Sequence, residues 1–135
     1  MTLVPGGNPC YCGQRGCVDA YCSAAVLSGS TDGSLDQFFA LLEQGKPEQT
    51  SLWEEYLEHL VLTLNNLRMI FDCDVVVGGY VGAHLQPYLG EIRRRAAQKN
   101  TFERNGGYLR VCGYRLEATA VGAALHYIDR FLREI

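Results

Sequence analysis

The chain lacks an apolar run long enough to cross a bilayer, and it lacks an excess of basic residues. Its 12 lysines and arginines are outnumbered by 15 acidic residues, so the net charge of −3 gives no electrostatic footprint for nucleic acid. The chain also opens without the basic and apolar segments of an export signal. The first two absences argue against a membrane-spanning and a DNA-binding protein. The lack of an export signal predicts a protein of the cytoplasm, which is a reducing compartment.

The 135 residues are 47% hydrophobic and 20% charged, as expected of a single globular domain with a core. Apolar spacing and turn residues predict, in order, a strand end at 2–5, helices over 18–27, 35–44 and about 52–71, a buried strand over 74–77, a helix over 84–98, a strand over 108–112 and a closing helix over 117–135. The alternation near the C-terminus indicates an α/β architecture with right-handed crossovers. Such short strands make a small, incomplete sheet for so much helix, which suggests part of a larger fold.

Cysteine, in contrast, is plentiful, and four of the six cysteines lie within the first 22 residues. The first three are Cys10, Cys12 and Cys17, placed around Gly13 and Gly16. Glycine adopts the backbone angles of a tight loop at little steric cost, and thiolates this close together can converge on one tetrahedral ion. Residues 8–19 are therefore predicted to form a zinc knuckle. A disulfide and buried apolar thiols are the alternatives, and a reducing compartment disfavours the disulfide.

The fourth ligand of the knuckle is not obvious, although a structural zinc site takes four. Cys22 is the remaining nearby thiol and is a candidate, but a helix beginning near Val18 would carry it more than one turn away. None of the three histidines lies near the knuckle in sequence. Cys73 and Cys112 lie in apolar segments and are predicted to belong to the core.

Two other features are candidates for ligand contact. Gly78 and Gly79 follow the predicted strand at 74–77, at the end of a strand where α/β sheets bind ligands. A tight turn explains the glycine pair equally well. Asp19 lies two residues after Cys17, where its carboxylate can accept hydrogen bonds from a polyhydroxy ligand or stabilise the start of a helix.

Three stretches resemble the ROK family (repressors, open reading frames and kinases). CYCGQRGCVDAYCSA is similar to the family signature CxCGxxGCxE, VVVGGYVGAHL to its strand and glycine pair, and LEATAVGAALHYI to its closing alanine-rich helix. The resemblance covers nearly the whole chain. It implies the C-terminal part of an actin-like, ribonuclease-H-like ATPase-fold lobe, with 1–135 forming a single partial domain.

The resemblance also implies roles for individual residues. Cys10, Cys12 and Cys17 match the family's zinc thiolates, and the family's fourth ligand is a histidine that would fall immediately before Met1. Asp19 stands where the family has a glutamate that contacts sugar hydroxyls, and Gly78 and Gly79 match the glycines near the adenine pocket. The phosphate loops and catalytic aspartate would lie upstream, so no catalytic residue is assigned within the chain.

Among family members, the chain is expected to be closest to regulators of the xylose- and N-acetylglucosamine-repressor type. Tyr80 and Val81 follow the glycine pair where kinases carry smaller residues, and their bulk would crowd an adenine ring. The leading interpretation is therefore the sugar-sensing C-terminal domain of a transcriptional regulator. The alternative is a C-terminal fragment of an ATP-dependent, glucokinase-like sugar kinase.

Zinc is the expected cofactor, with ATP only for a kinase. A carbohydrate and further copies of the chain are the expected partners, and DNA would be bound only through segments absent from this chain.

Overall fold

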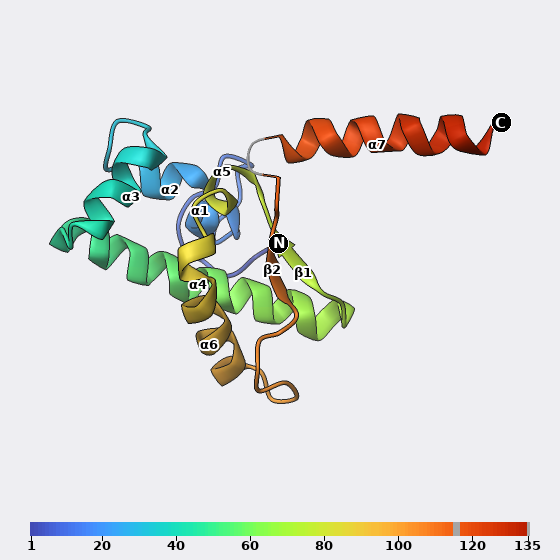
Figure 1. The fold of residues 1–135 in the computed structure, drawn as a ribbon. Helices are drawn as coiled ribbons and strands as arrows, with labels where there is room; N and C mark the ends of the chain where they lie inside the picture. The colour runs from blue at the N-terminus through green and yellow to red at the C-terminus, as the bar shows by residue number, and fades with distance from the viewer. Residues whose placement is uncertain (115–116, 135) are drawn as a thin grey trace.

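The computed structural model describes residues 1–114 and 117–134, and α4 (Pro47–Phe71) is its longest helix (Figure 1). Pro47 begins the helix because its fixed φ suits the first helical turn, where its missing N–H costs nothing. Asp72 ends the helix in the left-handed conformation, with φ of 48°. The face predicted from the sequence is buried over most of its length, at Trp53, Tyr56, Leu57, Leu60, Val61 and Leu64. At its end the prediction is wrong, because Leu67 is only half-buried and Phe71 is 66% exposed.

Three short helices pack on the first half of α4, namely α1 (Asp19–Cys22), α2 (Ala24–Ser28) and α3 (Leu35–Glu43). The Ser34 side chain caps α3 by accepting the backbone N–H of Gln37 at 3.2 Å, as its position before the helix predicts. The single helix predicted over 18–27 is wrong, because Ser23 is extended with ψ of 160° and divides it. At this break the carbonyl of Cys22 accepts a hydrogen bond from the Tyr56 hydroxyl at 2.9 Å.

The sheet has two parallel strands, β1 (Val75–Val77) and β2 (Leu109–Val111), with Val75 paired to Leu109. Between them run α5 (Gly79–Gly82), the 3-10 helix η1 (Gln86–Tyr88) and α6 (Leu89–Lys99). The predicted helix over 84–98 therefore begins later than expected, since the segment with Pro87 forms the separate η1 turn. Both strand predictions are confirmed in position. The predicted burial of β1 on both faces is wrong, because Val76 is 58% exposed.

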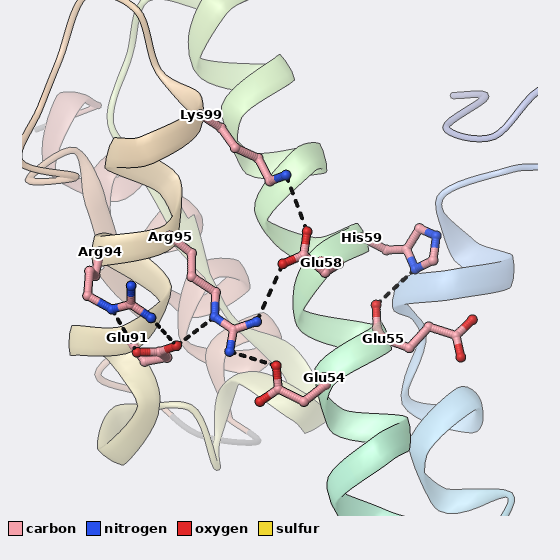
Figure 2. A network of polar contacts seen from close by, with 8 residues as sticks. All are labelled: Glu54, Glu55, Glu58, His59, Glu91, Arg94, Arg95 and Lys99. Atoms are coloured by element: carbon pink, nitrogen blue, oxygen red, sulfur yellow. Dashed lines mark hydrogen bonds and ion pairs between the residues drawn. The ribbon is translucent and has the colours of Figure 1, made fainter.

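Ion pairs join α4 to α6 at the surface, as Figure 2 shows. The Arg95 guanidinium is central: it lies 2.7 Å from Glu54 and 3.5 Å from Glu58 on α4, and 2.6 Å from Glu91 on its own helix. Lys99 adds a second link to Glu58 at 3.2 Å. Beneath this network the apolar side chains of the two helices form part of the core, so α4 is held on one side by α1–α3 and on the other by α6.

The last helix, α7 (Ala118–Arg133), differs from the other α-helices described because none of its residues is buried. In Figure 1 it extends away from the remaining elements. The sequence pattern correctly indicates a helix here. Its small residues, Ala118, Ala120, Gly122, Ala123 and Ala124, would let a neighbouring helix approach closely, but none of them is buried among the described residues. Cys73 also departs from prediction, since it is exposed rather than part of the core. No helix in the described ranges has the length and hydropathy needed to cross a bilayer.

Candidate metal centre

The backbone of the cysteine loop depends on two glycines with positive φ. Gly13 has φ of 83° and donates its N–H to the Cys10 carbonyl at 3.0 Å, which closes the tip of the loop. Gly16 has φ of 76° and lies against Val4, so that a Cβ at this position would come within 1.7 Å of the Val4 carbonyl oxygen. The Gly16 carbonyl accepts the N–H groups of Leu3 and Val4 at 2.7 and 3.0 Å. Only glycine tolerates both the positive φ and the close approach of the Val4 carbonyl at residue 16.

The first residues of the chain form one wall of this loop. Thr2 pairs with Cys17 in an antiparallel bridge, and the N–H of Val18 donates to the Met1 carbonyl at 3.0 Å. On the opposite side, the N–H of Asn8 donates to the Tyr21 hydroxyl at 2.7 Å, which ties the loop to α1. If this antiparallel pairing continued, a residue joined to Met1 on its N-terminal side would lie opposite Asp19, two residues after Cys17.

The structure brings the three predicted thiols together. The Sγ atoms of Cys10, Cys12 and Cys17 all lie within 4.8 Å of one another, and those of Cys12 and Cys17 are 3.6 Å apart. Two thiolates bound at 2.3 Å to one tetrahedral ion would be separated by about 3.8 Å. All six cysteines are free thiols. The donor set and its spacing fit a zinc ion.

The thiols of this group differ in acidity. Hydrogen bonding, first with the backbone at Gln14 and then with the neighbouring thiols, lowers the pKa of Cys12 below its usual value. The hydrogen bond with Cys12, together with desolvation, raises the pKa of Cys17 to about 11. Cys12 therefore loses its proton more readily than Cys17, and a bound cation would be needed to draw the proton from Cys17 near neutral pH.

Cys22 lies outside the three-thiol group. Its Sγ is 3.9 Å from the Thr63 hydroxyl on α4, and burial raises its pKa to about 11. A protonated, half-buried thiol facing α4 packs as a small apolar side chain. Asp19, in contrast, is exposed in the first turn of α1, two residues after Cys17. The hydrogen bonds of the cysteine loop thus hold the backbone from which this carboxylate projects.

Gly78 and Gly79 lie at a different place, directly before Tyr80, which lines a cavity of about 560 Å³; the two glycines themselves do not line it. Tyr80 and His84 line this cavity from the segment after β1, and Asp36 lines it from α3, whereas the three thiols and Asp19 do not. The His84 Nε2 is 3.6 Å from the Asp36 carboxylate, and its ring stacks on Phe39 with centroids 4.5 Å apart. Sequence analysis missed this pair because the two residues belong to separate segments that only tertiary packing brings together.

Comparison with known proteins gives one consistent result. A sequence model described as the ROK family matches residues 1–129. The N-acetylmannosamine kinase of Citrobacter koseri is 31% identical over 127 residues, covering 90% of this chain and 43% of the kinase. That of Escherichia coli K12 is 30% identical over 127 residues with the same coverage. Among solved structures, the ROK hexokinase of Thermus thermophilus superposes with a TM-score of 0.71 at 29% identity, covering 96% of this chain and 47% of the hexokinase.

These matches bear on both fold and function. The structural similarity confirms the actin-like ATPase fold, here represented by a helix-rich unit with a small parallel sheet. The chain spans less than half the length of these relatives. Because the named relatives are sugar kinases, they favour the kinase alternative over the regulator interpretation, which stays a prediction.

Proposed function

The chain belongs to the ROK family, and on that premise we propose that it is the zinc-stabilised, sugar-binding part of a ROK sugar kinase. The observation that carries the proposal is the convergence of Cys10, Cys12 and Cys17 two residues before the exposed carboxylate of Asp19. The similarity to N-acetylmannosamine kinases and a ROK hexokinase supports a hexose or an N-acetylated hexosamine as the ligand. The proposal assigns metal and sugar binding to this chain and leaves phosphoryl transfer to the whole kinase.

Cys10, Cys12 and Cys17 would hold the zinc ion, and the ion would supply a structural cross-link rather than a reacting group. Binding such an ion contributes directly to the free energy of folding of the loop that holds it. The segment that ends at Met1 and Thr2 pairs with Cys17 and Val18, and the family resemblance would place the fourth ligand immediately before Met1. Cys22 is a poor candidate because its thiol faces Thr63.

Asp19 would accept hydrogen bonds from two neighbouring hydroxyl groups of the sugar. An ionised carboxylate accepts such bonds with both oxygens, and bonds to a charged acceptor are roughly twice as strong as neutral ones. The loop contributes by limiting the movement of the Asp19 backbone, because Cys17 is fixed on one side and Tyr21 on the other. Orientation of this kind selects a particular arrangement of hydroxyls.

The cavity lined by Tyr80, His84 and Asp36 would take the nucleotide base of ATP. Gly79 has φ of 73° and nothing within 4 Å of a Cβ position, so the backbone is open to a flat ring. Tyr80 lines the same cavity and is 69% exposed, so it has room to stack on a base. The regulator alternative makes the opposite prediction, that the Tyr80 ring occupies the space of the base and that nucleotides do not bind.

Ligand binding to the zinc-loaded chain, followed by NMR chemical shifts, tests these assignments. N-acetylmannosamine and glucose are the sugar probes, and ADP with magnesium is the nucleotide probe. We expect a sugar to shift resonances around Asp19 and ADP to shift those of Tyr80 and His84. Asp19→Asn should abolish the sugar response while zinc content stays unchanged. Asp36→Asn, a matched change in the cavity lined by Tyr80 and His84, should leave the sugar response intact.

Two outcomes would contradict the proposal. A sugar response that survives Asp19→Asn would remove the carboxylate from the sugar site. A chain that binds both zinc and sugar but gives no response to ADP would support the regulator alternative instead.

A further inference from the structure

The cysteine loop holds its three thiols in unequal positions. Cys12, near the tip of the loop, is exposed, whereas Cys10 and Cys17 are half-buried. The Sγ atoms of Cys12 and Cys17 are 3.6 Å apart, which is close enough for a hydrogen bond between the two thiols. The sulfurs of a disulfide lie about 2.05 Å apart, so joining this pair shortens the separation by about 1.5 Å, a shift that side-chain rotation can supply.

Cys10 is a less suitable partner for Cys12. The Cys10 carbonyl accepts the N–H of Gly13 at 3.0 Å, and the Cys10 N–H donates to the Gln14 carbonyl at 2.9 Å, so its backbone is held on both sides. A bond from Cys10 to Cys12 would close a ring of three residues inside this turn, and rings that short adjust poorly. A bond from Cys12 to Cys17 would close a ring of six residues that includes both positive-φ glycines.

We propose that Cys12 and Cys17 form a redox-sensitive pair, which hydrogen peroxide converts into a reversible disulfide. The exposed Cys12 thiolate attacks one oxygen of the peroxide, which gives a sulfenic acid and releases hydroxide. The Cys17 thiolate then attacks the sulfenic sulfur, so the S–S bond forms and a second hydroxide leaves. Two electrons pass from the sulfurs to the peroxide, and two protons from solvent convert the hydroxides to water. A dithiol reverses the change and is itself oxidised to a disulfide.

The disulfide would take over the cross-link that zinc supplies to the reduced loop. With Cys12 and Cys17 joined, Cys10 is the remaining thiolate of the group, and one thiolate does not hold a structural zinc ion, which takes four ligands. The loop keeps its shape, because backbone atoms make the bridge between Thr2 and Cys17. Oxidation therefore exchanges a metal cross-link for a covalent one without displacing Asp19. The release of zinc rests on the metal site proposed above, whereas the pairing of the thiols rests on their geometry alone.

Disulfide mapping of the intact chain tests the pairing. The protein is treated with one equivalent of hydrogen peroxide, the remaining thiols are alkylated after denaturation, and the chain is digested without reduction. Trypsin cuts after Arg15 and chymotrypsin after Tyr11 and Tyr21, so each of the four N-terminal cysteines falls on its own peptide. We expect the peptides of Cys12 and Cys17 to be joined and the other two to be alkylated.

Cys22 serves as an internal control, because it is half-buried with its thiol facing Thr63. A bond from Cys12 to Cys10 or to Cys22, or a bond between two chains as the main product, would overturn the proposal.

Two matched variants identify the thiol that reacts first. Cys10→Ser and Cys12→Ser each remove one thiol of the group, and they are compared in the zinc-free form so that loss of a ligand does not enter. Cys10→Ser should form the disulfide as the unsubstituted chain does. In Cys12→Ser the oxidation of Cys17 should slow about tenfold or more, because the exposed thiol is gone. Equal rates in the two variants would overturn the proposal, and circular dichroism checks that both keep their helices.

A chromogenic chelator follows zinc during the same oxidation. We expect one ion to be released for each disulfide formed and to be taken up again after treatment with a dithiol. Disulfide formation with zinc retained would overturn the exchange of cross-links. A chain that holds no zinc before oxidation would refute the proposed metal site, whereas a mapped bond between Cys12 and Cys17 would still support the redox pair.

Discussion

Replacing each of the two positive-φ glycines of the cysteine loop by alanine separates backbone strain from steric contact. Gly13 and Gly16 have similar φ values, 83° and 76°. A Cβ at Gly13 would meet nothing within 4 Å, whereas a Cβ at Gly16 would lie 1.7 Å from the Val4 carbonyl oxygen. The first substitution therefore adds only the cost of the left-handed conformation, and the second adds displacement of the segment that frames the loop.

The magnitudes follow from these contacts. An alanine in the left-handed region costs about 1–2 kcal/mol, so Gly13→Ala should weaken zinc binding by about five- to thirtyfold if loop folding and metal binding are linked. In Gly16→Ala the Val4 segment must move, and the two hydrogen bonds that the Gly16 carbonyl accepts from Leu3 and Val4 are lost. At about 1 kcal/mol each, their loss brings the total to roughly 3–4 kcal/mol, or a few hundredfold in affinity.

Competition with a chromogenic chelator at fixed pH measures both affinities on the same scale. Urea unfolding of the zinc-loaded proteins provides a second measurement, in which Gly16→Ala should again show the larger loss. If the two variants bind zinc equally well, the Val4 contact does not shape the metal centre and the reasoning is refuted. If neither differs from the unsubstituted chain, the three thiols hold zinc without this loop conformation.

Three further predictions concern other parts of the chain. The Cys22→Ala variant should retain its full zinc content by elemental analysis, because the Cys22 thiol faces Thr63. Loss of zinc in this variant would show that Cys22 is one of the zinc ligands. Hydrogen bonds from Arg94 and Arg95 lower the pKa of Glu91 from 4.5 to about 2, so this carboxylate stabilises the fold above pH 4.5 and the contribution is lost as the pH falls through 2. In the Glu91→Gln variant, the helical circular dichroism signal should therefore fall less steeply as the pH is lowered. A loss of signal as steep as in the unsubstituted chain would contradict the stabilising role of the Glu91 carboxylate. Phe38 is fully buried, so Phe38→Ala should lower the free energy of unfolding in urea by about 3–5 kcal/mol, and a loss below about 1 kcal/mol would show that the site collapses around the change.

Local features of the sequence predicted local features of the structure. The cysteine knuckle was predicted because its thiols and glycines lie within eight consecutive residues, and α3 because Ser34 and the apolar spacing act within one short segment. The break of the helix at Ser23 was not predicted, since it accompanies a hydrogen bond from Tyr56 far along the chain. The pairing of Asp36 with His84 was missed for the same reason. Periodicity also correctly identified an apolar face on α7, but a pattern says nothing about what covers the face.

The placement of Thr2 and Met1 beside Cys17 and Val18 has a practical consequence for preparing this protein. These backbone pairings would hold the start of any affinity tag fused to the N-terminus close to the cluster of three thiols. A tag containing histidines would place imidazoles within reach of the same ion and would tighten metal retention artificially. Metal stoichiometry should therefore be compared between tagged protein and protein from which the tag has been cleaved.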